Sequence, residues 1–353
     1  MSRVRGPRRL RRLERAAVLA ASVTALALTA SGCVVVHGER ELLPGATRAE
    51  AATALAQFTA AYNKADRAYD SSLDADRVTG AFGAIDAARL RAGRTNSPSG
   101  NAAHSPLTLT DAKFTIPKKA GWPRWFLADA KGSKGGGSRW LLVFTRHSLT
   151  GTWQVAYLTL VAPDAVPKFR VDEDGWAEDV PAGSPGLAAA PSGLSRAYAT
   201  YLKDGGDTFA PGPHTTAWRA LRAKNAVRPG LATQYIDEPL SGGDHAPLAL
   251  RTADGGALVF FATRHFQKQT AAAGASVPTP NKDVRALTKG EIKQSLTMEF
   301  VSTEAALDPA AGTGSGSGAG SGSGSSSGSG SGSGGEKVSV VGRVQGMTSA
   351  QGG

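Results

Sequence analysis

The spacing of apolar residues changes from helical to alternating twice along this chain, and this change restricts the folds that it can adopt. Leu55, Phe58 and Tyr62 recur at spacings of three and four, which is typical of one buried face of a helix. Residues 152–161 alternate instead between two faces, as a strand does. The same order returns after residue 191. We therefore predict an α+β fold of two tandem related domains, each a helix pair packed on a curved antiparallel sheet.

The first half is expected to hold two helices followed by four antiparallel strands. Thr47 and Glu50 fit a capping box, in which each side chain accepts a hydrogen bond from the other's backbone amide, so a helix should begin there. The other expected elements are a helix over 74–92 and strands over 107–116, 125–127, 139–147 and 152–161.

The second half repeats this order. Ser192 is a candidate cap for one helix, and Thr215 or Thr216 for another. Strands are expected over 231–236, 247–252, 257–266 and 291–302. In addition, Thr145-Arg146-His147 ends one strand of the first half and Thr263-Arg264-His265 ends one of the second. This echo and the shared order of elements favour an internal duplication.

Composition suggests where the domains begin and end. We expect a first domain over 47–180, a Pro/Gly/Ala-rich linker over 181–191 and a second domain over 192–346, followed by a tail over 347–353. Residues 311–335 are almost pure glycine and serine and should form a disordered insertion. Because valines alternate over 337–344, we expect a strand after the tract and interpret the tract as a long hairpin loop, with 291–302 as the partner strand. The alternative is a cell-wall spacer that leads to a disordered tail.

The amino terminus is typical of an export signal, expected over residues 1–32. Arginines up to Arg15 precede an uncharged run over 16–30, which is shorter than the roughly 20 residues of a membrane-spanning helix. An uncleaved anchor helix over 16–36 is the alternative, and the paired arginines leave Sec and twin-arginine export both open.

Ala30-Ser31-Gly32-Cys33 resembles the lipobox of bacterial lipoproteins, although Ala30 stands where leucine is usual. The resemblance implies cleavage between Gly32 and Cys33 and attachment of a lipid to Cys33. Since Cys33 is the one cysteine of the chain, its lipidation would leave no free thiol in an oxidising compartment. We expect a lipidated tether over 33–46 that holds the protein at the outer face of the cell membrane.

The net charge of +11 does not indicate a nucleic-acid partner. Seven arginines lie within the first 15 residues, in the signal that is expected to be removed, and the rest of the chain has no basic stripe interleaved with aromatic residues. We therefore expect the membrane, and an unknown envelope protein or small ligand, as partners.

Two helices followed by antiparallel strands resemble the cone-shaped fold of ketosteroid isomerase, the polyketide cyclases and nuclear transport factor 2. The chain also resembles a family of uncharacterised actinobacterial, Streptomyces-type secreted lipoproteins. The segments that carry this second resemblance are Ser31 to Arg40, Lys119 to Phe126, Gly212 to Thr216 and Gly255 to Thr263. It implies a lipid-anchored location and supplies no catalytic residue.

Several kinds of catalytic motif are missing from the sequence. The glycine clusters lack the lysine and helix of a phosphate-binding loop, the six histidines form no metal-ligand spacing, and no Gly-x-Ser-x-Gly elbow follows a strand. We expect no cofactor and no metal, and favour a protein that is not an enzyme.

Six residues are candidates for facing a ligand. They are two strand-end pairs and two tryptophans: Arg146, His147, Arg264, His265, Trp122 and Trp125. Solvated strand ends are the more ordinary interpretation, because neighbours on a strand face opposite ways, and tryptophan is more often mostly buried. Asp129 and Asp254 are candidate general bases, although both lie beside glycine-containing turns.

Two functions remain open. We favour a non-enzymatic envelope lipoprotein that binds a ligand or partner protein. The alternative is a lyase or isomerase that acts on a small apolar substrate in a cone pocket. A buried carboxylate or histidine with a perturbed pKa facing an apolar cavity would favour the enzyme.

Overall fold

The computed structural model describes residues 41–312 and 336–353, and residues 42–353 form one compact unit. The expected signal peptide over 1–32, its cleavage after Gly32 and the lipidation of Cys33 lie outside the described residues. The glycine-serine insertion expected over 311–335 also lies outside them, apart from its first two residues.

Two helices open the described chain, as expected. Helix α2 (Arg48–Ala68) begins after Thr47, whose hydroxyl accepts from the Glu50 amide while the Glu50 carboxylate accepts from the Thr47 amide, which confirms the capping box. The short 3₁₀ turn η2 (Ser71–Leu73) follows α2, and helix α3 (Gly80–Asn96) starts later than expected, because residues 74–77 form a turn and Val78 bridges Val155.

The four strands of the first half form one antiparallel sheet, which confirms their expected order. Its order is β2 (Leu109–Thr115), β4 (Arg124–Gly132), β5 (Arg139–Arg146) and β6 (Gln154–Val161). Strands β4, β5 and β6 are buried on both faces, whereas the edge strand β2 is mostly exposed.

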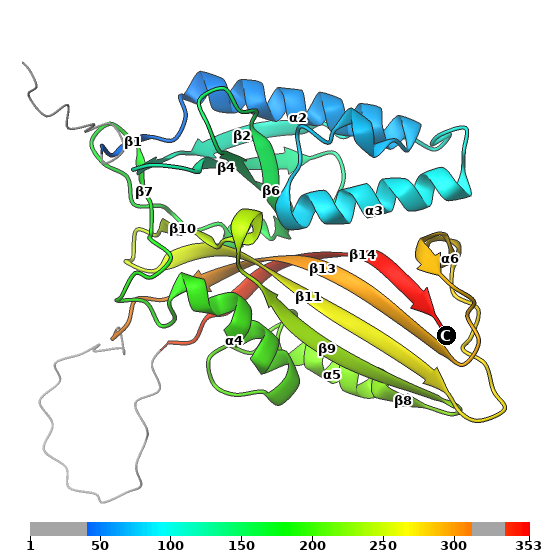
Figure 1. Ribbon diagram of the computed structural model, residues 1–353. Helices are drawn as coiled ribbons and strands as arrows, with labels where there is room; N and C mark the ends of the chain where they lie inside the picture. Colours follow the sequence, from blue (N-terminus) through cyan, green and yellow to red (C-terminus); the bar gives the residue numbers. More distant parts are fainter. Residues whose placement is uncertain (1–40, 313–335) are drawn as a thin grey trace, which may run out of the picture. The chain divides into compact units, whose positions relative to one another are not determined.

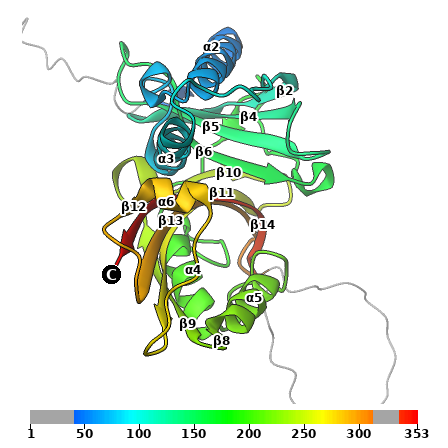
Figure 2. The same cartoon turned by 90° about the vertical axis from the view of Figure 1, so that its right-hand side faces the viewer.

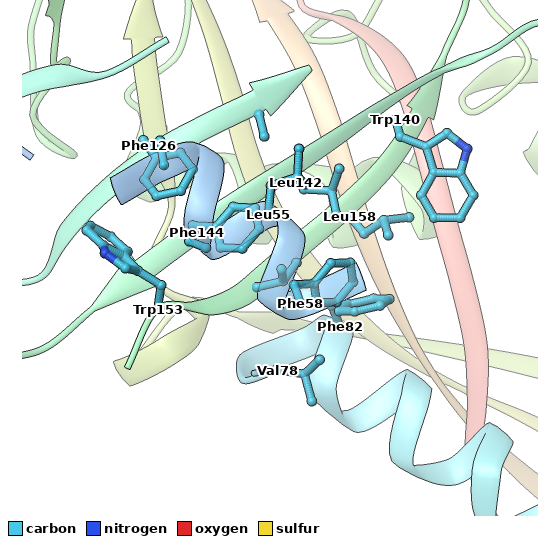
Figure 3. Packing of buried hydrophobic residues seen from close by; sticks show 14 of the residues in the cluster. Leu55, Phe58, Val78, Phe82, Phe126, Trp140, Leu142, Phe144, Trp153 and Leu158 are labelled. Carbon is cyan, nitrogen blue, oxygen red and sulfur yellow. The ribbon is translucent and has the colours of Figure 1, made fainter. Parts of the chain in front are cut away.

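Helix α2 covers one face of the four-stranded sheet with an apolar core. Phe58 lies against Phe144, and Phe144 stacks on Phe126 at 4.7 Å between ring centroids (Figure 3). Trp125 and Leu127 point to the opposite face, since successive side chains of a strand alternate.

The second half again places two helices before a sheet. Helix α4 (Pro191–Asp204) starts at Pro191, so Ser192 lies inside it and the expected Ser192 cap is wrong. Thr215 stands at the N-cap position of α5 (Thr216–Ala226), but its hydroxyl donates to the Ala210 carbonyl instead of accepting from the helix.

A seven-stranded sheet follows, with strand order β12-β14-β13-β11-β9-β8 and β10 beside β11. Its members are β8 (Val227–Arg228), β9 (Leu231–Leu240), β10 (Leu248–Arg251), β11 (Ala257–Ala271), β12 (Thr288–Lys289), β13 (Ser295–Asp308) and β14 (Ser339–Gly352). The four strands expected in this half are present, and most are longer than expected. The short helix α6 (Lys282–Leu287) lies beside α3.

The strand expected after the glycine-serine tract is confirmed. Strand β14 pairs antiparallel with β13 from Ser339 opposite Leu307 to Gly352 opposite Leu296. The expected tail over 347–353 is wrong up to Gly352, because these residues hydrogen-bond to β13 and β12 and Ala350 lies in an apolar cluster.

The two sheets pack face to face and share a core. Trp125 and Leu127 of the first sheet lie in one buried cluster with Leu258 and Phe260 of the second. The layers are therefore α2, the four-stranded sheet, the seven-stranded sheet, and α4 with α5 (Figures 1 and 2). At Gly342 a Cβ atom would lie 2.7 Å from Val161, so β14 approaches β6 closely only because it carries glycine there.

This arrangement is α+β, but it does not confirm two tandem domains. The residues expected as a linker, 181–191, run along the second sheet, where Leu187 is buried and bridges Ala310. Thr145 and Arg146 lie on β5 of the first sheet, and Thr263 to His265 lie on β11 of the other. This placement of the Thr-Arg-His echo does not by itself confirm a duplication.

A third, small sheet corrects the expected tether over 33–46. Strand β1 (Leu43–Pro44) pairs with β3 (Pro117–Lys119), which also pairs with β7 (Ala177–Glu178). Ordered structure thus begins before Thr47, because these backbone groups find strand partners and Ala46 is buried. Among the described residues no helix is long and apolar enough to cross a membrane.

Candidate functional site: an ionic cluster beneath helix α5

Helix α5 contacts the seven-stranded sheet through charged and aromatic side chains. Five elements contribute to what we call the Trp218 cluster. Its members are Trp218 and Arg222 on α5, Asp237 on β9, His265 on β11, Glu304 on β13 and Arg343 on β14.

A bidentate ion pair joins α5 to β9. The two terminal nitrogens of Arg222 donate to the two carboxylate oxygens of Asp237 at 2.7 and 2.9 Å, and both side chains are buried. A fork of this kind fixes the orientation of the guanidinium.

The Trp218 ring contacts two cations. The guanidinium carbon of Arg222 lies 5.0 Å from the ring centroid and that of Arg343 lies 4.6 Å from it. Cation–π attraction of this kind strengthens where water is excluded, so the ring helps to hold both arginines in place.

Glu304 is the most deeply buried carboxyl group of the cluster. It accepts a hydrogen bond of 2.9 Å from the Thr263 hydroxyl and lies 3.5 Å from Nε of Arg343. Burial away from water raises the pKa of Glu304 to about 8, although Arg343 and Thr263 act in the opposite direction.

His265, one of the expected ligand-facing residues, lies in this cluster. Its ring stacks on Phe300 at 4.8 Å and meets the edge of Trp218 at 6.4 Å. Burial, helped by the positive charges of Arg222 and Arg343, holds the pKa of His265 far below its usual value, so the imidazole is neutral.

Several buried polar atoms of the cluster have no hydrogen-bond partner among the described residues. They are Nε1 of Trp218, Nε of Arg222, Nε of Arg343 and Oε2 of Glu304. An unsatisfied buried polar group destabilises the folded state by about 1–3 kcal/mol, so these unpaired atoms reduce the stability of the protein.

A groove of about 570 Å³ opens beside the cluster, between α5, β9 and the end of α4. Its polar lining comes from Lys203, Thr216, Arg219, Arg222, Thr233, Tyr235 and Asp237. We call it the α5 groove. It contains three cationic side chains and one carboxylate, and Arg222 already engages that carboxylate.

The strand-end pairs do not meet in one site. Arg146 lies over the Trp153 ring at 4.6 Å, and His147 is half exposed, with Nε2 3.2 Å from Asp244. Arg264 points away from the Trp218 cluster and pairs with Glu238 and Glu299. Of the four residues, only His265 joins the cluster.

A second cavity, of about 680 Å³, opens beside the small sheet β1-β3-β7, and neither Trp122 nor Trp125 lines it. Trp122 is exposed, whereas Trp125 is fully buried and donates to Asp179 at 2.7 Å, so Trp125 is not on an exposed rim. Burial raises the pKa of Asp179, which lines this cavity.

The two aspartates considered as general bases have structural roles. Asp254 accepts from Thr252 and from the Gly256 amide in a turn, which lowers its pKa. Asp129 lies within β4 and accepts from Nε of Arg139 at 2.6 Å. Over the described ranges no three potential metal ligands of the His, Cys, Asp or Glu type gather.

Most of the Trp218 cluster was not predicted from the sequence. Glu304 and Arg343 stand at inward positions of strands, where an apolar residue is usual, and that exception to the alternation was a usable signal. No local signal connects them to Arg222 and Asp237, because four separate segments meet there.

The chain belongs to the family described as Domain of unknown function (DUF8094), whose profile matches residues 42–352. It is 67% identical to an uncharacterized lipoprotein of Streptomyces coelicolor and 55% identical to one of Streptomyces avermitilis, each over 352 residues that cover 100% of both chains. A second Streptomyces coelicolor lipoprotein is 31% identical over 215 residues, which cover 57% of this chain and 59% of that protein.

No solved structure matches this chain, so the expected cone fold of nuclear transport factor 2 is not confirmed. The expected membership of a Streptomyces lipoprotein family is confirmed.

Proposed function

We propose that this protein is an extracytoplasmic lipoprotein, held at the outer face of the membrane through Cys33, that binds a small anionic ligand in the α5 groove without chemical turnover. The observation that carries the binding proposal is the charge of the groove. Lys203, Arg219 and Arg222 line one cavity, and its single carboxylate, Asp237, is occupied by Arg222.

The ligand chemistry follows from the lining. Guanidinium and ammonium groups recognise carboxylate, phosphate or sulfate, and the Thr216, Thr233 and Tyr235 side chains add hydroxyl groups. Because Asp237 fixes one face of Arg222 and Trp218 lies against another, the cationic floor is preorganised, which reduces the ordering cost of binding.

A thermal-shift titration with inorganic phosphate, sulfate and citrate tests the binding proposal. A ligand at 100 times its Kd should raise the stability of the native protein by about 2.7 kcal/mol and so raise Tm. Arg219→Gln should abolish the shift. Lys224→Gln, on the same helix but outside the groove lining, is the matched control and should keep it. Equal shifts in both variants would contradict binding in the groove.

The lipid anchor has its own test. The names of the relatives and the Ala30-Ser31-Gly32-Cys33 segment both support it. We expect Cys33→Ala to leave the precursor uncleaved and unlabelled by a fatty-acid probe, whereas Ser31→Ala should be processed normally. Labelling of Cys33→Ala at the wild-type level would contradict the anchor.

A lyase or isomerase is the second candidate, and Glu304 is the observation that favours it. With a pKa near 8 it is largely protonated at neutral pH and has the chemistry of a general acid. However, Glu304 is fully buried and lines none of the cavities described above, so a substrate has no visible route to it. Turnover of a bound ligand that Glu304→Gln abolishes would favour the enzyme over the binding protein.

A further inference from the structure

Four exposed apolar side chains gather around the small sheet β1-β3-β7. The exposed fractions are 64% for Leu42, 41% for Leu43, 41% for Trp122 and 54% for Val171. Leu149, at 81%, is exposed alone in a turn elsewhere. Isolated exposed apolar residues are ordinary, but a gathered set indicates an interaction surface.

These four side chains are linked by shared neighbours at the small sheet. Leu42 and Val171 both line the cavity of about 680 Å³, together with Lys119. Leu43 pairs with Lys119 in the small sheet, and its carbonyl accepts from Arg124 at 3.0 Å. The guanidinium of Arg124 in turn lies 5.7 Å from the ring of Trp122. We call the four residues the anchor face.

The charged groups around the anchor face compensate each other. Lys118 lies 2.5 Å from Asp172, and Arg170 lies 3.5 Å from Glu178. A surface with paired charges and exposed aromatic and aliphatic side chains meets little electrostatic opposition at a layer of lipid headgroups. Trp in particular favours the boundary between headgroups and acyl chains, where its ring is in an apolar layer and its N–H is near water.

The position of the anchor face in the chain indicates what covers it. The compact unit begins at Leu42, and residues 34–41 separate this residue from Cys33. Even fully extended, that connection spans only about 30 Å. A lipid on Cys33 would therefore keep this face within a short distance of a membrane and at a high effective concentration.

We propose that the anchor face lies against the lipid bilayer, with Leu42, Leu43, Trp122 and Val171 at the boundary between headgroups and acyl chains. This proposal rests on the lipid anchor proposed above. Its consequence is a fixed orientation, in which the 680 Å³ cavity opens towards the membrane surface.

Spin labels at single cysteines test the orientation. The lipidated full-length protein is reconstituted into vesicles of phosphatidylethanolamine and phosphatidylglycerol. Leu42→Cys, Trp122→Cys and Val171→Cys are labelled one at a time. Because lipid attachment consumes the native thiol of Cys33, the introduced cysteine is the site of labelling in each variant. Leu149→Cys and Leu221→Cys are matched controls, since both leucines are exposed and neither lies at the small sheet.

We expect the ratio of accessibility to oxygen over accessibility to a water-soluble nickel complex to be severalfold higher for the three face labels than for the controls. Equal ratios on protein that floats with the vesicles would overturn the docking proposal and leave the anchor standing. Protein that does not float, with Cys33 itself accepting the label, would instead remove the anchor. Dipolar coupling between copies, with low oxygen accessibility, would show that a second copy covers the face and would also overturn docking on lipid.

Discussion

Helices α2 and α5, on the two outer sides of the molecule, contact their sheets through opposite chemistry. On one side, α2 meets its sheet through Leu55 and Phe58, which pack on Phe126 and Phe144. On the other, α5 meets its sheet mainly through the Trp218 cluster, which contains two arginines and two carboxyl groups. Both contacts join a helix to a sheet, but only the first is an ordinary apolar core (Figure 3).

The difference indicates which side carries function. An apolar contact is sufficient to hold a helix on a sheet, whereas buried ion pairs must offset a large desolvation cost and are often no more stabilising than apolar residues of similar size. Charges kept at such a contact therefore favour a role in binding. We therefore expect substitutions at the α2 contact to change stability alone and substitutions at the α5 contact to change ligand binding.

The largest effect is expected from truncation after Ala310, which removes β14 and with it Arg343. Because the two sheets share the cluster that contains Trp125, Leu127, Leu258 and Phe260, we expect the whole unit to unfold and not only the second half. Far-ultraviolet circular dichroism and a thermal melt check this. A truncated protein that keeps the wild-type Tm would show that β14 is dispensable.

Phe58→Ala tests the apolar side. Phe58 is fully buried and contacts the rings of Tyr62, Phe82 and Phe144, so its removal leaves a cavity. We expect the free energy of unfolding to fall by about 3–5 kcal/mol, with unchanged ligand binding. Urea titration measures the free energy of unfolding, and thermal shift measures ligand binding. Ser72→Ala, at an exposed position, is the control. A loss of binding in still-folded Phe58→Ala would contradict the separation of roles.

A double-mutant cycle tests the ionic side. Arg222→Met alone leaves Asp237 buried without its partner and should cost about 3 kcal/mol. Arg222→Met combined with Asp237→Leu should recover most of that stability but should not bind the anionic ligand. Urea titrations of the two single variants and the double variant give the coupling free energy between Arg222 and Asp237. If the double variant is as unstable as the singles, the pair is a structural requirement and not a binding device.

Glu304→Gln tests the pH dependence that the cluster should cause. The pKa of Glu304 is raised in the folded state, so its contribution to stability is fully present below its unfolded value of 4.5 and is lost as pH rises through about 8. Wild-type Tm should therefore fall between pH 5 and pH 9, and Glu304→Gln should reduce that fall. Glu299→Gln on the same strand is the control. If Tm of Glu304→Gln depends on pH as that of the wild type does, Glu304 stays ionised beside Arg343.

A buried carboxyl group in the first half should also lower Tm as pH rises. Burial and the neighbouring Asp86 raise the pKa of Asp74 to about 8, between α2 and α3. Thermal melts across the same pH range should therefore show that Asp74→Asn further reduces the fall in Tm that remains in Glu304→Gln.

Local patterns predicted most of the elements but not their assembly. The stripe through Leu55 and Phe58 and the Thr47 capping box located α2, because helix periodicity and caps are short-range properties. The face-to-face packing of the sheets was missed, since strands buried on both faces, such as β4, give no sign of what covers each face. Likewise Arg222 and Glu304 are far apart in sequence, and only the fold places them around Trp218.

The smallest effect is expected in the connection between the last two strands of each sheet, which also differs between the two sheets. Residues 147–153 join β5 to β6, whereas residues 309–338 join β13 to β14. Both hairpins have paired ends, so the longer connection differs mainly in closure entropy. Replacing residues 313–335 by about six glycine and serine residues roughly halves its length. We expect a gain of about 0.6 kcal/mol, a Tm increase of one or two degrees, and no change in ligand binding. A matched replacement by the same number of scrambled glycines and serines should leave Tm unchanged. A marked fall in Tm on shortening would show that the tract itself is required for the pairing of β13 with β14.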